Sequence, residues 1–164
     1  MDVVLPQSVT VAMIVSYARE CIESGISMYH RALHDPQEYL HSLIERANGN
    51  PKYLVNGLLP SQTFYACSDG KILGAIRVRH GSNEQVEQVI GHIGYETRPS
   101  ARNQGVAKFM LQWVIQNHLI CPKLISVEAD NWPSIRVIQS VAPTELSSHY
   151  DEKLGTIRRF KIEP

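Results

Sequence analysis

The residues whose types and spacing best suit chemistry lie between Gly91 and Trp113, which reads as a short strand, a polar loop and a helix. From the loop onward, apolar residues recur at the spacing of one helical face, as Val106, Phe109, Met110, Trp113 and Val114. The first N–H groups of a helix lack internal partners, and the helix dipole is positive at that end. The entrance of this helix therefore suits an anion such as a diphosphate.

Three residues around the loop strengthen this interpretation. Gly105 allows phosphate oxygens to approach where a Cβ would stand in the way. Arg102 supplies a fixed positive charge with several donors, and Ala107 is small. The nucleotide fingerprints do not fit, because no Lys-Ser or Lys-Thr pair follows a glycine loop and there is no G-x-G-x-x-G. Taken alone, the pattern could also be an ordinary strand-to-helix connection.

A second group of candidates lies on the two strands before the loop. Alternation places His92 and Glu96 on one face of one strand, and Arg77 and Arg79 on one face of the strand before it. If these faces coincide, the four side chains form a titratable cluster. Histidine, with an ordinary pKa near about 6.5, suits a base at neutral pH, and a glutamate can serve if burial raises its pKa. The alternative is a structural Arg–Glu–His network beneath the loops.

The spacing R-x-x-G-x-A of Arg102, Gly105 and Ala107 resembles the pyrophosphate loop of the GNAT superfamily of acetyl-CoA-dependent N-acetyltransferases. The string GHIGYETRPSARNQGVA is similar to one subgroup of predicted acetyltransferases that share GHIGY, RPS and R-x-x-G-x-A. The resemblance extends to GAIRVRH, DNWPSIRVI and RRFKI, and it covers most of residues 36–162. It implies one domain over 1–164, of class α/β (α+β): a mixed, mostly antiparallel sheet with a splayed parallel strand pair and about four helices.

The resemblance also implies a reaction. Acetyl-CoA would be the co-substrate, and its acetyl group would pass to the primary amine of a small-molecule or peptide acceptor by direct attack, with no covalent intermediate and no metal. A CoA-binding module of the same fold with weak or lost catalysis is the first alternative. A structural or interaction protein that keeps only the fold is the second.

Family positions can be carried over to the cofactor site of this sequence. The backbone around Tyr95 and Thr97 should pair with the pantetheine arm as an added strand would. Asn131 matches an asparagine that commonly contacts the CoA arm, although it could equally be only a helix N-cap. Arg77 and Arg79 are the candidate substrate-binding residues. The residues expected around the pyrophosphate are Arg102, Asn103, Gln104, Gly105, Val106 and Ala107.

The general acid departs from the family pattern. Many members place a tyrosine in the helix after the asparagine, but the corresponding position here is the apolar Ile138, and no tyrosine lies in 132–142. The subgroup's double glycine after that helix is Ala142-Pro143 here. Tyr150 is a candidate substitute, or else a packed aromatic. Without it, solvent supplies the proton or catalysis is weak.

The composition limits the partners and the cellular compartment that can be expected for this chain. The chain has 164 residues, with 16 acidic side chains balancing 16 basic ones, so neither nucleic acid nor a membrane is an expected partner. Its three cysteines are odd in number and far apart, which favours reduced packing thiols. The N-terminus lacks the pattern of a signal peptide, and no apolar run approaches the roughly 20 residues of a membrane span. We expect a cytoplasmic protein, for which a homodimer is an option because this fold often dimerises.

The elements that must position these residues follow from periodicity and turn signals. The spacing predicts helices over 8–23, 35–47 and 105–119, and a short one capped by Asn131 whose inward residues are Ile135, Ile138 and Val141. It predicts strands over 2–5, 63–67, 71–80, 86–97, 124–129, 145–150 and 156–162. The strand–helix–strand order around the loop predicts a right-handed crossover between parallel strands. In the superfamily, the first two helices border the acceptor site.

Overall fold

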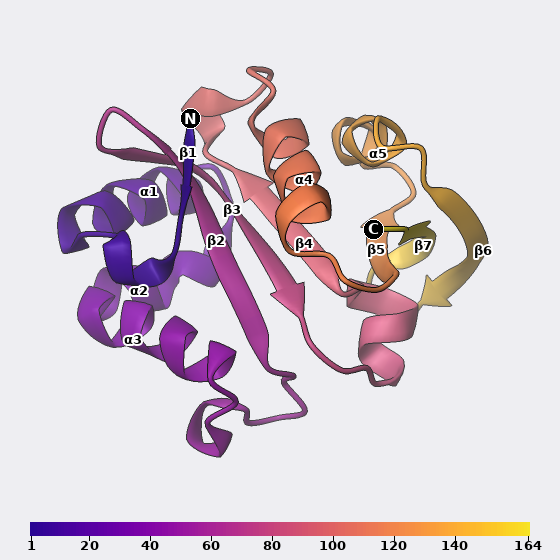
Figure 1. The fold of residues 1–164 in the computed structure, drawn as a ribbon, viewed down its shortest axis with the longest axis horizontal. Helices are drawn as coiled ribbons and strands as arrows, with labels where there is room; N and C mark the ends of the chain where they lie inside the picture. The colour runs from indigo at the N-terminus through magenta and orange to yellow at the C-terminus, as the bar shows by residue number, and fades with distance from the viewer. The chain divides into compact units, whose positions relative to one another are not determined.

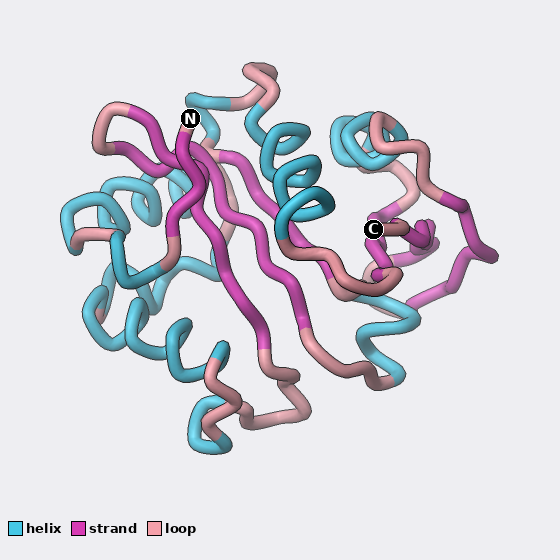
Figure 2. Tube along the Cα trace, viewed as in Figure 1, coloured by secondary structure: helices cyan, strands magenta, loops and turns pink.

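The computed structural model describes residues 1–164. Seven strands form a mixed sheet in the order β1-β2-β3-β4-β5-β7-β6, whose parallel pair is β4 with β5 (Figures 1 and 2). The strands are β1 (Asp2–Val4), β2 (Ser61–Ser68), β3 (Lys71–Arg79), β4 (Ile93–Thr97), β5 (Lys123–Glu128), β6 (Thr144–Asp151) and β7 (Gly155–Ile162). The helices are α1 (Val11–Glu23), α2 (His30–His34), α3 (Pro36–Ala47), α4 (Val106–Asn117) and α5 (Trp132–Gln139). The predicted fold class is confirmed, with one α-helix more than expected.

The chain divides into two compact units, residues 1–80 with 95–106 and residues 81–94 with 107–164. No helix in either unit is both long and apolar enough to cross a membrane.

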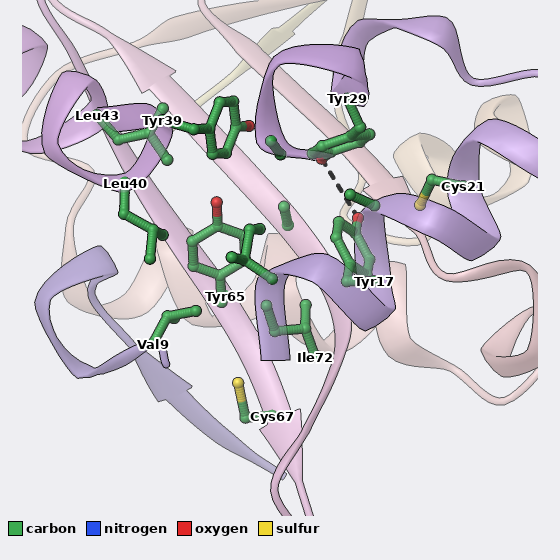
Figure 3. Packing of buried hydrophobic residues seen from close by; sticks show 14 residues of the cluster. Val9, Tyr17, Cys21, Tyr29, Tyr39, Leu40, Leu43, Tyr65, Cys67 and Ile72 are labelled. Carbon is green, nitrogen blue, oxygen red and sulfur yellow. Dashed lines mark hydrogen bonds between the residues drawn. The ribbon is translucent and has the colours of Figure 1, made fainter. Parts of the chain in front are cut away.

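The first unit packs α1, α2 and α3 against the antiparallel strands β1, β2 and β3 (Figure 1). Its core is rich in tyrosine (Figure 3). The rings of Tyr17 and Tyr29 meet edge to face at 5.0 Å between centroids, and the Tyr29 hydroxyl donates to that of Tyr17 at 3.4 Å. Tyr65 of β2 meets Tyr17 at 6.4 Å. Such pairs bury large rings while their hydroxyl groups find partners.

In the second unit, β7 lies between β5 and β6 and pairs with both in the antiparallel sense. Phe160 of β7 lies opposite Ile125 of β5 on one side and opposite Glu145 of β6 on the other. Its last hairpin turns at Asp151, whose Oδ1 accepts from the backbone N–H groups of Lys153 and Leu154, both at 2.9 Å. Helix α5 begins where predicted, because Asn131 Oδ1 accepts from Ser134 N at 3.2 Å.

Several predicted boundaries need correction. The first helix is capped by Thr10, whose side chain accepts from Met13 N, while Ser8 belongs to a separate 3-10 turn. Helix α2 was not expected. The strand predicted over 86–97 is wrong in its first half, because Val86–Ile90 is a π-helical turn. Asn83 explains this difference: its Oδ1 accepts from Val86 N at 2.9 Å and so starts a helical turn.

Gly91 packs closely against the backbone of β5. Its φ is 67°, and a Cβ there would lie 2.7 Å from Ser126 N and 2.9 Å from Leu124 O. Both are backbone atoms of β5 that cannot rotate away. We expect Gly91→Ala to lower the free energy of unfolding by about 2–4 kcal/mol, because strain at φ and the clash add.

Urea denaturation measures this loss, and Gly81→Ala is the matched control. Gly81 has a similar φ of 78° but nothing within 4 Å of its Cβ position. It should lose only about 1 kcal/mol, the cost of a left-handed conformation for alanine. Equal losses at the two glycines would show that the contact with β5 contributes nothing.

Candidate active site

The loop before α4 is open and partly left-handed. Arg102, Asn103, Gln104 and Gly105 are exposed, and φ is 61° at Asn103 and 80° at Gly105. Nothing lies within 4 Å of the position that a Cβ of Gly105 would take. A glycine is favoured here by the backbone conformation, and the space above it is free for a ligand oxygen. The geometry fits a pyrophosphate at the start of α4, where Val106 is buried and Ala107 is half-buried.

The loop is tied to α1 by two residues that the sequence analysis did not select. Glu20 of α1 accepts from the backbone N–H of Ser100 through Oε1 and from Arg98 Nε through Oε2. Arg98 also donates to Ser16 Oγ at 3.0 Å and to Ile72 O at 3.3 Å. These hydrogen bonds lower the pKa of Glu20, although its burial opposes them. The signal available in the sequence was the RPS string itself, which contains Arg98 and Ser100.

Glu96 is the titratable group whose environment is most unusual. It is half-buried on β4, and desolvation of its carboxyl group raises its pKa from 4.5 to about 8. The negative charge of Glu96 in turn helps to raise the pKa of the buried Tyr17 hydroxyl, after burial itself. Burial thus shifts the pKa of Glu96 in the direction that a base at this position would need, and its role as a base stays a prediction.

Glu96 acts on buried groups of α1. After burial itself, its charge contributes to the raised pKa of both Tyr17 and Cys21, which are buried side chains of that helix. Tyr65 of β2 also meets Tyr17, in the core beneath the helices. We infer that Glu96 and Tyr65 lie on the same side of the sheet.

Arg77 and Arg79 lie on that face as well. Arg77 is opposite Thr63, and its Nε donates to Thr63 Oγ1 at 3.4 Å. Arg79 is opposite Ser61, and burial and then the charge of Arg77 lower its pKa to about 10. A titratable cluster of Glu96 with the two arginines stays a prediction.

His92 has a different role from the one predicted. Its backbone N–H donates to Leu124 O at 2.7 Å, and its Nδ1 accepts from Leu124 N at 3.2 Å. The imidazole is buried and uses its basic nitrogen to hold β5. In that tautomer Nε2 carries the proton, so the ring has no lone pair left to take one from an amine. The structure favours the structural alternative for His92.

The other predicted residues lie as follows. Tyr95 and Thr97 are half-buried on β4. The Asn131 side chain is a helix N-cap, and a contact with CoA stays a prediction. Ile138 is buried, as expected for an inward position, whereas Val141 follows the end of α5 and is half-buried. Tyr150 is 70% exposed on β6, so the alternative of a packed aromatic is wrong.

Comparison with known proteins agrees with this geometry. The model of the acetyltransferase (GNAT) family matches residues 26–141. The chain therefore belongs to this family, and it is an acetyl-CoA-dependent N-acetyltransferase. No match was found among curated proteins.

Solved structures of the same fold include several bacterial N-acetyltransferases. The ribosomal-protein-alanine N-acetyltransferase of Brucella melitensis has a TM-score of 0.65 at 14% identity, over 100% of both chains. Mycobacterium smegmatis RimJ in complex with CoA-disulfide has a TM-score of 0.66 at 16% identity, over 94% of this chain and 79% of that one. A Salmonella typhimurium enzyme that modifies the N-terminal serine of ribosomal protein L7/L12 has a TM-score of 0.66 at 9% identity, over 99% of both. At these identities the likeness shows the fold.

Proposed function

We propose that this protein acetylates the primary amine of a small-molecule or peptide acceptor, with Glu96 as the base that removes the proton from the amine. The observation that carries the proposal is the buried carboxyl of Glu96, whose pKa of about 8 is close to that of a useful base at neutral to mildly alkaline pH. Membership of the GNAT family identifies acetyl-CoA as the acetyl donor.

The proposed reaction needs no covalent enzyme intermediate. The ionised carboxylate of Glu96 takes a proton from the ammonium group of the acceptor, directly or through water. The amine lone pair then forms a C–N bond to the thioester carbonyl carbon. The C–S bond breaks, and the nitrogen releases its second proton to solvent as the amide forms. CoA leaves as a thiolate and takes a proton from solvent, which is feasible because a thiol has a pKa near about 8.5. Turnover should therefore rise with pH until Glu96 is fully ionised, above about pH 8.

We propose that the loop from Arg102 to Ala107 binds the pyrophosphate of CoA. The exposed guanidinium of Arg102 and the open space at Gly105 support this assignment. Backbone groups of Tyr95 and Thr97 would hold the pantetheine arm.

Peptides belong among the acceptors to test, because structural relatives include enzymes described as acting on ribosomal proteins. The test is a thiol-release screen in which acetyl-CoA is mixed with pools of small amines and of peptides with free N-termini. Calorimetry of CoA binding accompanies it. CoA binding without turnover of any pool would contradict the proposal and favour the catalytically weak CoA-binding module, which the buried Ile138 in place of a tyrosine supports.

Tyr150→Phe tests whether the last hairpin supplies a general acid. The side chain is 70% exposed on β6, so a hydroxyl there has no desolvated surroundings to tune it. We expect the turnover number to change by less than about twofold, because a functioning acid contributes about 100-fold or more. A hundredfold loss of turnover with unchanged CoA affinity would show that Tyr150 protonates the leaving thiolate.

A further inference from the structure

Three arginines of the first unit act electrostatically on the buried Tyr39. Arg46 lies seven residues after Tyr39 on α3 and so emerges from the same face of that helix. Arg77 belongs to β3 and Arg31 to α2. Burial raises the pKa of the Tyr39 hydroxyl, and the positive charges of Arg77, Arg46 and Arg31 each oppose that rise. Three cations from three elements thus act on one buried hydroxyl.

This group of arginines has no acidic partner. The ion pairs of the molecule join Arg98 to Glu20, Arg158 to Glu145 and Lys161 to Glu163. Next to Arg46 in sequence, Glu45 is engaged by the side-chain amide of Asn50.

The absence of an acidic partner leaves Arg46 with an unsatisfied donor and a lowered pKa. Its Nε is buried and has no hydrogen-bond partner. Desolvation, and then repulsion from Arg77 and Arg31, lower its pKa. Arg77 makes one long hydrogen bond, to Thr63 Oγ1 at 3.4 Å. A partly buried cation with an unused donor is unfavourable unless an anion completes it.

The arginines and the proposed base share one face of the sheet. Glu96 acts on Tyr17, which Tyr65 meets, and Arg77 lies opposite Thr63, two residues before Tyr65 on β2. A strand rises about 3.3 Å per residue, so Thr63 and Tyr65 lie about 7 Å apart along the strand. On this side of the sheet, Tyr65 of β2 and Tyr39 of α3 approach one another (Figure 3). An acceptor of a few bonds' length could present an amine to Glu96 and an anion to Arg77.

We propose that Arg46, Arg77 and Arg31 bind a carboxylate of the acceptor whose amine reacts at Glu96. The inference rests on the proposed function and specifies its substrate class. A guanidinium presents paired N–H donors that match the two oxygens of a carboxylate, and it stays charged when partly buried. The carboxylate is either the α-carboxylate of a free amino acid or the side chain of an acidic residue at a peptide N-terminus.

The first experiment measures binding without catalysis. Glutarate, a dicarboxylate that cannot be acetylated, is titrated against the full chain by calorimetry and by thermal shift, with neutral glutaramide as the control ligand. We expect glutarate alone to bind and to raise the melting temperature. Arg46→Gln and Arg77→Gln should each weaken binding at least tenfold, and Arg136→Gln, an exposed arginine of α5, should leave it unchanged.

The melting temperature of each variant without ligand shows whether the substitution affects folding. Removing one of several unpaired like charges relieves repulsion, so Arg46→Gln without ligand should melt at the same temperature as the wild type or higher. A large fall in melting temperature for Arg46→Gln would overturn the proposal, because it would show that Arg46 already has a stabilising structural role.

The second experiment compares acceptors in matched pairs. Alanine against alaninamide tests the α-carboxylate, and Asp-Ala-Ala amide against Asn-Ala-Ala amide tests the side chain. We expect one carboxylate in these pairs to raise kcat/KM at least tenfold. Arg46→Gln should remove that advantage by raising KM for the carboxylate acceptor, and Arg136→Gln should leave the advantage in place.

Each failure has a distinct meaning. Turnover of amines without preference for either carboxylate, together with no glutarate binding, would overturn the carboxylate site and leave the proposed function standing. Glutarate binding that depends on Arg46, without turnover of any amine, would contradict the proposed function instead. A preference for O-phosphoethanolamine over every carboxylate acceptor would show that the anion is a phosphate, and it would overturn the assignment.

Discussion

Gly105→Asp is expected to weaken CoA binding by about 100- to 1,000-fold, equivalent to about 3–4 kcal/mol. The substitution puts a negative carboxylate into the free space at the start of α4, where the pyrophosphate is proposed to lie. Repulsion between like charges adds to the loss of charge-assisted hydrogen bonds from the loop. Titration calorimetry with CoA measures the effect directly.

Gly105→Asn is the matched control for this substitution. Asparagine has the size of aspartate and tolerates a positive φ such as the 80° at this position, but it carries no charge. It should lose about tenfold in affinity at most, from steric hindrance alone. If folded Gly105→Asp protein bound CoA as tightly as the wild type, the loop could not be the pyrophosphate site.

Glu96→Gln is expected to lower kcat by about 100- to 10,000-fold, the range that a general base contributes. Glutamine keeps the size and the hydrogen-bonding capacity of the protonated acid but cannot accept a proton from the amine. Affinity for CoA should not change, because Glu96 lies outside the phosphate loop. The kcat of the wild type should rise up to about pH 8, and the residual kcat of the variant should not follow that titration.

Stability provides the control for Glu96→Gln. Below pH 4.5 the carboxyl group is protonated in both the folded and the unfolded chain, and between pH 4.5 and about 8 only the unfolded chain releases the proton. The wild-type free energy of unfolding therefore falls as pH rises through this range, by about 3 kcal/mol at pH 7. The variant should lack this slope and be more stable at pH 8 than the wild type in urea denaturation. Wild-type turnover in a variant with this stability profile would exclude Glu96 as the base.

The fold could be predicted from the sequence wherever local signals agreed with one another. The Asp69-Gly70 pair predicted the β2–β3 hairpin, and both residues have the positive φ values, 49° and 70°, that such a turn needs. Asp35 and Asn131 were correctly placed as N-caps. The prediction failed at Val86–Ile90, where a segment that contains Val86, Val89 and Ile90 follows Asn83. The side chain of Asn83 accepts from Val86 N and starts a helical turn there, and the composition of the segment does not reveal that hydrogen bond.

The candidate site was predictable in its loop and less so in its partners. Spacing and the family resemblance proposed the loop over 102–107, and its open backbone at Gly105 suits that proposal. Alternation proposed Glu96 and Arg77 as neighbours, which stays a prediction. His92 was misassigned because alternation says which way a side chain points and nothing about the strand that it meets. The contact between Glu20 and Ser100 could not be predicted from local patterns, because the two residues are 80 positions apart in the sequence.

The link between Glu20 and the loop has a consequence for engineering acceptor specificity. The first helices of this fold are natural segments to exchange between relatives when a new substrate is wanted. In this chain, Glu20 and Ser16 of α1 also hold Arg98, and Glu20 holds the backbone of Ser100. A chimera that imports a foreign α1 without these two side chains would therefore change two properties at once, and its altered substrate profile would be confounded with a weakened donor site. Grafts that retain Ser16 and Glu20 would keep the two properties separable.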